Sequence, residues 1–218
     1  MRNVITENNK RLYSAIGAVL GWFAIILQCY LMLHNRTAAI PETLIRFFGF
    51  FTILTNILVA VCFAILAVKP IDKRGPFFAR PSTVTALTVF IAVVGIVYNV
   101  ILRFLWSPQG LQFIVDELLH SVMPVLFIVY WFIFVPKQSL KWKNILPWLI
   151  YPTVYCIYSL VRGAMVNWYP YPFLDVNILG YNKVLFNIVG MMILFVIIAL
   201  LLVGIAKQIT NRSAGKIL

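Results

Sequence analysis

Six long apolar runs follow one another along the chain, and they constrain its fold more than any other feature. A helix of about twenty residues crosses the ~30 Å hydrocarbon core of a membrane, and the runs have about that length. Hydrophobic residues make up 62% of the 218 residues, so most of the chain cannot face water. We therefore predict an all-α polytopic membrane protein, a single six-helix bundle over residues 1–218. The expected helices cover residues 12–33, 44–68, 83–105, 112–135, 145–163 and 183–206.

The distribution of Lys and Arg predicts the orientation of this bundle. Of the 18 such residues, few fall in the expected outer connections or outer helix ends: Arg36, Arg46, Arg103, Arg162 and Lys183. Positively charged connections stay in the cytoplasm, so both termini are predicted to be cytoplasmic. We expect a plasma-membrane protein, which in a bacterium means the inner membrane.

The net charge of +12 bears on the partners of the chain. The basic residues are divided among short connections at one membrane face and do not form a folded basic domain. We therefore expect contact with anionic membrane lipids and no nucleic-acid partner. The three cysteines, Cys29, Cys62 and Cys156, fall inside expected helices and are predicted to be apolar packing groups.

Polar residues within the expected helices lie at one depth. Thr52 and His120 are each eight residues into a helix that enters from outside, which corresponds to about 12 Å. The same outer half holds other polar residues: Gln28, Thr55, Asn56, Tyr98, Asn99, Tyr158, Ser159 and Asn187. The inner halves hold no Asn, Gln, His or charged residue. Because polar groups in hydrocarbon are costly and mark functional sites, we predict a polar pocket in the outer half and disfavour a polar path across the membrane.

His120 is the most informative of these residues, and three roles are open for it. Asp116 and Glu117 precede it by four and three residues, so the three side chains share a helix face. His120 is a packing residue satisfied by a neighbouring helix, a metal ligand with Glu117 in an E-x-x-H pattern, or a general base for a hydroxyl nucleophile. A metal is disfavoured because His34 is the only other histidine, and we expect no other cofactor.

If His120 is a base, Thr52 is the candidate nucleophile by depth, and Thr55, one helical turn deeper, is the reserve. Asp116 is expected to hold the imidazole in position. Asn56 and Asn99 are candidate donors to an oxyanion. A purely structural explanation of the threonines is also open, since hydroxyls in membrane helices commonly bond to the carbonyl four residues earlier.

Several residues are candidates for binding a substrate. Arg103 and Arg162 at the outer rim are placed to hold a carboxylate by bidentate hydrogen bonds, or else to extend to lipid headgroups. Tyr158 and Asp175 are further substrate-binding candidates. The aromatic segment 162–183 before the last helix is either an interfacial belt or a lid over the pocket.

Three short motifs occur in an order that resembles a known family. They are "FFTILTN" with Thr52, "LLHSVMP" with His120 and "WYPYPFLD" before the last helix. In motif order, spacing and topology, the chain resembles the androgen-induced and androgen-dependent six-helix membrane proteins, hydrolases of fatty acid esters of hydroxy fatty acids, and most of all their bacterial six-helix relatives. The resemblance implies a metal-independent esterase of lipid substrates with Thr52 as nucleophile and His120 as catalytic histidine. Asp116 and Glu117 depart from the family's pattern, so the orienting role of Asp116 comes from its spacing alone.

We therefore expect a hydrolase of lipid-like, fatty-acyl esters that works through an acyl-threonine intermediate. Two other classes of protein remain open. A small proton-coupled transporter would titrate Asp116, Glu117 and His120, and it would need a polar relay through the inner half. In a non-catalytic membrane scaffold or partner subunit, a neighbouring helix would simply satisfy His120.

Overall fold

The computed structural model describes the backbone of residues 2–69, 71–105 and 107–214, and the side chains of residues 7–69, 71–105 and 107–212. Within these residues, every regular element is a helix. Six of the described helical segments are long and apolar enough to cross a membrane, as predicted. They are Glu7–His34, Phe51–Val68, Pro81–Phe104, Gly110–Phe134, Trp142–Val166 and Val176–Arg212.

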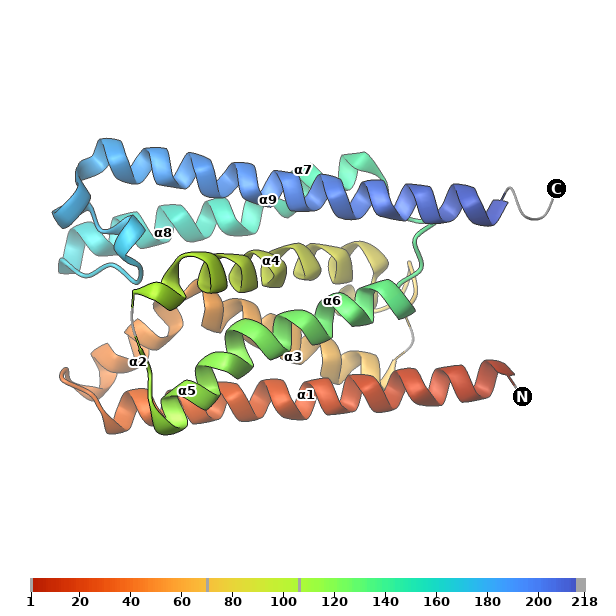
Figure 1. The fold of residues 1–218 in the computed structure, drawn as a ribbon, viewed down its shortest axis with the longest axis horizontal. Helices are drawn as coiled ribbons and strands as arrows, with labels where there is room; N and C mark the ends of the chain where they lie inside the picture. Colours follow the sequence, from red (N-terminus) through yellow and green to blue (C-terminus); the bar gives the residue numbers. More distant parts are fainter. Residues whose placement is uncertain (1, 70, 106, 215–218) are drawn as a thin grey trace.

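The helices form one elongated bundle (Figure 1). The α-helices of the described chain are α1 (Arg2–His34), α2 (Ile40–Gly49), α3 (Phe51–Val68), α4 (Pro81–Val100), α5 (Gly110–Glu117), α6 (Met123–Phe134), α7 (Ile145–Trp148), α8 (Ile150–Val166) and α9 (Val176–Ala214). The start of α1 and the end of α9 lie at the same end, as an even number of spans requires. The helices α2 and α5 and the α8–α9 connection lie at the opposite end, which we call the site end.

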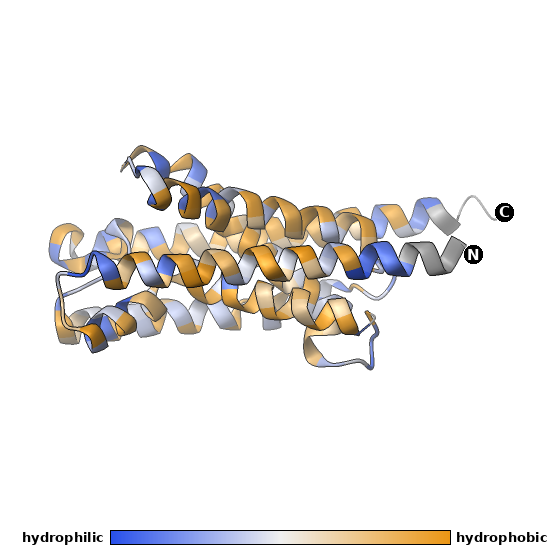
Figure 2. Ribbon diagram, turned by 90° about the horizontal axis from the view of Figure 1, so that it is seen from below, coloured by the Kyte–Doolittle hydropathy of each residue, from blue (hydrophilic) through white to orange (hydrophobic). Residues whose placement is uncertain are grey.

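Helix α4 is the central helix of the bundle. It contacts α3, α6 and α9, and its buried residues face all directions. A helix that is apolar all round is the expected sequence for such a position. In contrast, α1 and α9 expose large apolar side chains such as Val19 and Phe186. Hydrophobic residues dominate along the middle of the helices, and hydrophilic ones gather towards both ends of the bundle (Figure 2). This is the pattern of helices that contact lipid.

The second expected helix, residues 44–68, differs from the structure because the chain breaks at Phe50. The backbone there is extended, with φ −84° and ψ 126°. The Gly49 carbonyl accepts a hydrogen bond of 2.9 Å from the Tyr155 hydroxyl, and the Thr52 N–H donates one of 3.1 Å to the Tyr171 hydroxyl. These two hydroxyls replace helical bonds that the break removes. Thr52 therefore lies in the first turn of α3, not eight residues inside a helix.

The connection before the last helix is shorter than expected. Helix α8 ends at Asn167, which adopts a left-handed conformation with φ 52°. Helix α9 begins at Val176 and is kinked at Gly180, where φ is 73°. The Tyr- and Pro-rich connection therefore covers only residues 167–175, and its aromatic side chains lie at the site end.

Gly163 on α8 makes room for the Tyr169 ring in this connection. A Cβ atom at Gly163 would lie 1.9 Å from Tyr169 Cε1. We expect Gly163→Ala to lower the free energy of unfolding by about 1–3 kcal/mol, the usual cost of overpacking. Thermal unfolding of the purified protein in detergent measures this. Gly190→Ala is the control, because a Cβ there has nothing within 4 Å, and an unchanged melting temperature for Gly163→Ala would contradict the described packing.

Candidate active site

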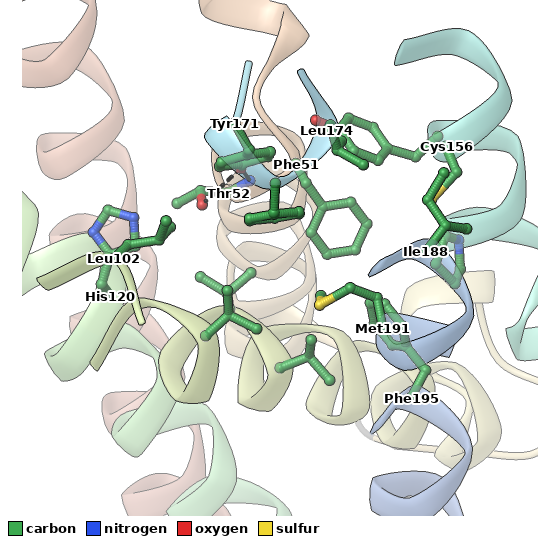
Figure 3. A pocket seen from close by; sticks show the side chains of 16 residues that line it. Phe51, Thr52, Leu102, His120, Cys156, Tyr171, Leu174, Ile188, Met191 and Phe195 are labelled. Carbon is green, nitrogen blue, oxygen red and sulfur yellow. Dashed lines mark hydrogen bonds between the residues drawn. The ribbon is translucent and has the colours of Figure 1, made fainter. Parts of the chain in front are cut away.

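Two neighbouring cavities meet at the residues predicted to carry the chemistry. The larger has a volume of about 670 Å³, and the smaller about 50 Å³. Four residues line both cavities and form what we call the boundary: Thr52, Leu102, His120 and Tyr171. Figure 3 shows Thr52 and Tyr171 close together, with His120 on the same side of the smaller cavity. The structure thus brings the predicted nucleophile and the predicted base to one place.

The two cavities differ in polarity. Polar side chains line much of the larger one, among them Gln28, Arg36, Arg46, Tyr98, Gln112 and Asp116. Apolar and aromatic side chains line the smaller one beyond the boundary, among them Phe51, Val94, Val97, Phe173, Met191 and Phe195. A cavity with polar groups on a largely apolar wall and an almost wholly apolar cavity therefore meet at Thr52 and His120, an arrangement suited to an amphiphilic ligand.

The hydroxyl of Thr52 faces the cavities, and that of Thr55 does not. Thr52 Oγ1 lies 3.2 Å from the Tyr171 hydroxyl, and its N–H donates to the same oxygen. Thr55 is fully buried, and its Oγ1 lies 3.1 Å from the Tyr151 hydroxyl. Both hydroxyls thus pair with a tyrosine and not with a carbonyl of their own helix. Only Thr52 lines a cavity, which favours it over the reserve candidate.

His120 is held from two sides. Its ring stacks on that of Tyr98, with centroids 3.9 Å apart and planes at 13°. Its Nδ1 lies 2.9 Å from the main-chain carbonyl of Asp116. Because a carbonyl only accepts hydrogen bonds, Nδ1 carries a proton, and in the neutral ring the other nitrogen, Nε2, keeps its lone pair. Such an imidazole is ready to act as a base.

Asp116 positions His120 through a different atom from the one expected. The hydrogen bond to the imidazole comes from the main chain, while the carboxylate accepts bonds of 3.1 Å from both Tyr98 Oη and Gln112 Nε2. Gln112 also donates to Gln28 at 2.8 Å. The carboxylate thus fixes the phenol ring on which the imidazole stacks.

The fourth expected helix, residues 112–135, is interrupted at His120 itself. Helix α5 gives way to a π-helix, η3 (Leu118–Val122), before α6 begins. The N–H of Met123 donates to the Leu118 carbonyl, five residues earlier. The next residue, Pro124, has no N–H to donate. Residue 124 would serve the Leu119 carbonyl in a π-helical register and the His120 carbonyl in an α-helical one, so the proline removes a helical donor beside both.

Two asparagines from neighbouring helices satisfy these carbonyls. Asn56 on α3 donates to the Leu119 carbonyl at 3.2 Å, and Asn99 on α4 donates to the His120 carbonyl at 3.2 Å. Buried carbonyls without a partner are costly, so these bonds stabilise the interrupted helix. They also fix the position of His120 relative to α3 and α4.

The geometry does not support the expected role of Asn56 and Asn99 as oxyanion donors. Each amide also donates within its own helix, Asn56 to the Thr52 carbonyl at 2.9 Å and Asn99 to the Gly95 carbonyl at 2.8 Å. An amide nitrogen carries two N–H groups, and both are engaged in each case. The two asparagines therefore have structural roles here.

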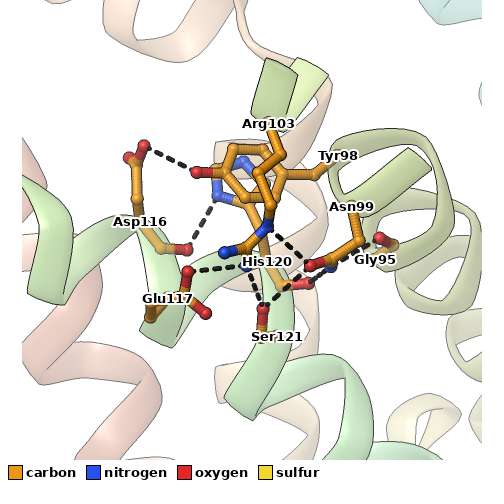
Figure 4. A network of polar contacts seen from close by, with 8 residues as sticks. All are labelled: Gly95, Tyr98, Asn99, Arg103, Asp116, Glu117, His120 and Ser121. Carbon is orange, nitrogen blue, oxygen red and sulfur yellow. Dashed lines mark hydrogen bonds and ion pairs between the residues drawn. The ribbon is translucent and has the colours of Figure 1, made fainter. Parts of the chain in front are cut away.

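Arg103 belongs to a polar network behind His120 (Figure 4). It forms an ion pair of 2.6 Å with Glu117 and donates to Asn99 Oδ1 at 3.0 Å and to Ser121 Oγ at 3.2 Å. Its guanidinium also lies over the Tyr98 ring, 5.3 Å from the centroid. Arg103 lines neither cavity, so its expected contact with a substrate carboxylate is not supported.

Arg162 is likewise engaged in a cluster and does not line a cavity. It donates to Glu42 at 2.9 Å, and Arg46 donates to the same carboxylate oxygen at 2.7 Å. Both guanidinium groups lie over the Trp168 ring, at 5.2 Å for Arg46 and 5.0 Å for Arg162. This cluster joins α2, α8 and the α8–α9 connection. Arg36 and Arg46 both line the larger cavity, and their guanidinium groups are the cationic groups on its wall.

Tyr158 and Asp175 lie away from both cavities. Tyr158 is 41% exposed on α8. Asp175 accepts a hydrogen bond of 2.9 Å from the Asn177 N–H at the start of α9. The structure therefore gives Asp175 a helix-capping role and does not support either residue as a substrate contact.

A metal site has no support among the described residues, where no group of three or more His, Cys, Asp and Glu side chains lies close enough to hold an ion. Glu117, the partner of His120 in the E-x-x-H pattern, is paired with Arg103. The described site is built from hydroxyl, imidazole and carbonyl groups.

Sequence reasoning missed Tyr171 and Arg46 as site residues. Tyr171 lies within "WYPYPFLD", and the lid interpretation of that segment was the available signal. Arg46 had been grouped with the outer basic residues by its charge alone. Neither contact follows from local spacing, because Tyr171 and Thr52 are 119 residues apart.

Comparisons with known proteins do not place the chain in a family. No protein-family model, no curated protein and no solved structure matches it. The resemblance to the androgen-induced and androgen-dependent hydrolases therefore rests on the three motifs, and the geometry of the site must carry the functional argument.

The described role of Asn99 leads to a testable coupling with Pro124. Asn99→Ala leaves the His120 carbonyl unpaired, at an expected cost of about 1–3 kcal/mol in unfolding free energy. Pro124→Ala restores an N–H four residues after His120, so the double variant should recover part of that loss. A double-mutant cycle by chemical unfolding in detergent measures the coupling. Additive effects would contradict the account of the orphaned carbonyl.

The cluster around Glu42 predicts a pH dependence of stability. Hydrogen bonds and charge from Arg46, and then from Arg162, hold the pKa of Glu42 below its ordinary value of 4.5. A lowered folded-state pKa means that the stabilisation is present above the ordinary pKa and is lost as the pH falls through the folded value. Melting curves of wild type and Glu42→Gln should therefore differ at neutral pH and converge in acid.

A control for this prediction is Glu7→Gln. Glu7 is half exposed and lies 3.4 Å from Lys10, so its replacement should shift the melting temperature little. A difference between wild type and Glu42→Gln that stays constant down to acidic pH would count against an ionic role for Glu42.

Proposed function

We propose that this chain is an integral membrane hydrolase of lipid-like esters, with Thr52 as the nucleophile and His120 as the general base. The observation that carries the proposal is the boundary, where a hydroxyl and an imidazole stand between a large cavity that carries polar groups on its wall and a small apolar cavity. An ester bond at this position has its polar part in the larger cavity and the start of its acyl chain in the smaller one.

The reaction follows from the arrangement of the two side chains. His120 Nε2 takes the proton of Thr52 Oγ1 as that oxygen attacks the ester carbonyl. The imidazole then protonates the leaving alkoxide and later activates the water that hydrolyses the acyl-threonine. In the described structure Thr52 Oγ1 hydrogen-bonds to Tyr171 and not to His120, and such catalytic bonds often tighten only in the complex with substrate.

The lining of the larger cavity favours an amphiphile with an anionic group. Arg36 and Arg46 lie on its wall, and a carboxylate such as that of a free fatty acid chain binds guanidinium groups well. This fits a fatty-acyl ester, the substrate class that the family resemblance implies. Arg46 already pairs with Glu42, which holds the guanidinium in place without neutralising Arg36.

The location of the protein is part of the same proposal. We place it in the plasma membrane, the inner membrane of a bacterium, with both termini in the cytoplasm and the site end towards the outside. Membrane lipids cover the exposed apolar faces of α1 and α9 and supply the route by which a lipid-like substrate arrives.

The rival classes have less support. A proton-coupled transporter needs a polar relay, but buried hydroxyls at the other end of the bundle bond within their own helices: Ser14 to Lys10 O, Thr85 to Pro81 O and Thr88 to Val84 O. These bonds do not connect to His120. A scaffold protein gives no reason for a hydroxyl and an imidazole to share a cavity boundary.

Covalent labelling tests the proposal directly. A fluorophosphonate probe should label the purified wild-type protein in detergent, because it forms a stable adduct with an activated hydroxyl. Labelling should disappear in Thr52→Ala and His120→Ala. Thr55→Ala is the matched control: its hydroxyl has the same type of tyrosine partner but lines no cavity, so labelling should persist. A folded wild-type protein that takes up no probe would overturn the proposal.

A further inference from the structure

We infer that Tyr171 is a third catalytic residue, whose hydroxyl donates a hydrogen bond to the oxyanion formed when Thr52 attacks the ester. This inference rests on the proposed hydrolase function and adds to it a residue from the α8–α9 connection. It replaces the asparagines as the source of oxyanion stabilisation.

The position of the Tyr171 hydroxyl is the first support. Its oxygen is 3.2 Å from Thr52 Oγ1 and accepts the Thr52 N–H at 3.1 Å. An oxyanion donor has to lie beside the nucleophile, within about 3 Å of the place where the carbonyl oxygen will be. Tyr171 touches the reacting oxygen and lines both cavities, so it lies at this place.

Elimination among the described boundary residues is the second support. The side chain of Leu102 has no polar group, and His120 is needed as the base. The amides of Asn56 and Asn99 each donate two bonds to main-chain carbonyls. Tyr171 is the side-chain donor that remains at the boundary.

The surroundings of Tyr171 hold its ring in place. Phe173 stacks on it, with centroids 5.1 Å apart and planes at 6°, and Phe50 meets it edge-on at 5.7 Å. The neighbouring Trp168 is fixed by two guanidinium groups. A ring held in this way donates its hydrogen bond with little reorganisation, which is what makes oxyanion donors effective.

The hydroxyl also keeps its proton under ordinary conditions. Burial raises the pKa of Tyr171 above its usual value of 10.0. A protonated phenol has one O–H to donate, and in the described structure Thr52 Oγ1 is its neighbour. That O–H becomes available to the substrate once Thr52 turns to His120.

Acylation passes through one tetrahedral intermediate. The Thr52 Oγ1–carbonyl carbon bond forms, the Thr52 proton passes to His120 Nε2, and the π pair of the carbonyl moves to its oxygen. Tyr171 O–H donates to that oxyanion while its oxygen still accepts the Thr52 N–H, and Tyr171 keeps its proton throughout. When the tetrahedral intermediate collapses, the bond to the leaving oxygen breaks and His120 returns the proton to the alkoxide.

The experiment compares Tyr171→Phe with Tyr151→Phe. Both remove a hydroxyl that pairs with a threonine of α3, but the Tyr151 partner is Thr55, which lines no cavity. Hydrolysis of p-nitrophenyl octanoate by the purified protein in detergent is measured, with melting curves to verify folding. We expect kcat to fall about 10²- to 10³-fold in Tyr171→Phe, as for loss of one oxyanion donor, with KM unchanged, and kcat to remain in Tyr151→Phe.

A second readout separates a catalytic role from a structural one. An alkyl trifluoromethyl ketone forms a tetrahedral adduct with an active-site hydroxyl and carries an oxyanion. Its affinity should fall in Tyr171→Phe by the same factor as kcat/KM, because transition-state analogues report interactions made only with the developing charge. Equal affinity in wild type and Tyr171→Phe would overturn the inference.

The outcomes separate this inference from the proposed function. An active wild type with an equally active or faster Tyr171→Phe variant overturns the role of Tyr171 alone. A folded wild type that neither hydrolyses the ester nor binds the ketone overturns the hydrolase itself. Should Tyr171→Phe not fold, 3-fluorotyrosine at position 171 keeps the ring and the hydroxyl but ionises at lower pH. The alkaline limb of the pH–rate profile should then move to lower pH, and an unmoved limb overturns the inference.

Discussion

Pro124 has no N–H to donate just after the π-helical turn, and the position of the site depends on the bonds that the carbonyls of Leu119 and His120 accept in that turn. The amides of Asn56 and Asn99 reach them from two different helices. Close approach of α4 at this point is possible because residue 95 is glycine; a Cβ there would lie 3.1 Å from Pro124. These two bonds, made where Pro124 has no N–H to donate, hold His120 between α3 and α4. Its side chain there lines both cavities.

Thr52 reaches the cavities through a second interruption of the same kind. At Phe50 the chain leaves the helical conformation, and the hydroxyls of Tyr155 and Tyr171 take the places of the lost hydrogen bonds. A continuous helix would engage the Thr52 N–H in its own backbone. At the break this N–H donates to the Tyr171 hydroxyl instead, and Tyr171 therefore lies beside Thr52 at the cavity boundary. Both interruptions exchange helical bonds for tertiary ones, and both do so at the site.

The cluster of Glu42, Arg46, Arg162 and Trp168 links this local geometry to the outer connections. It joins α2, α8 and the segment that carries Tyr171. Because the carboxylate is shared by two guanidinium groups, loss of its charge weakens both contacts at once. The cluster is thus suited to keep the α8–α9 connection over the cavities while Arg46 remains available on the wall of the larger one.

The sequence by itself determined the six spans and the level at which polar residues gather. Span length and hydropathy reflect each segment's own contact with lipid, so they can be read locally. The common depth of Thr52 and His120 predicted that they share a pocket, and both line the two cavities, although Thr52 lies in the first turn of its helix and not deep inside it. The sequence contains the proline and aromatic residues at the two interruptions, but it does not show that the helices break there or which side chains replace the lost hydrogen bonds.

The tertiary structure alone decided which groups the site can use. It engaged Asn56, Asn99 and Arg103 in structural bonds, placed Tyr158 and Asp175 elsewhere, and brought Tyr171 to Thr52 across 119 residues of sequence. Each of these outcomes depends on which donors remain after main-chain groups of other helices have been satisfied. These hydrogen bonds join segments that are distant in the sequence, so no local pattern of residues predicts them.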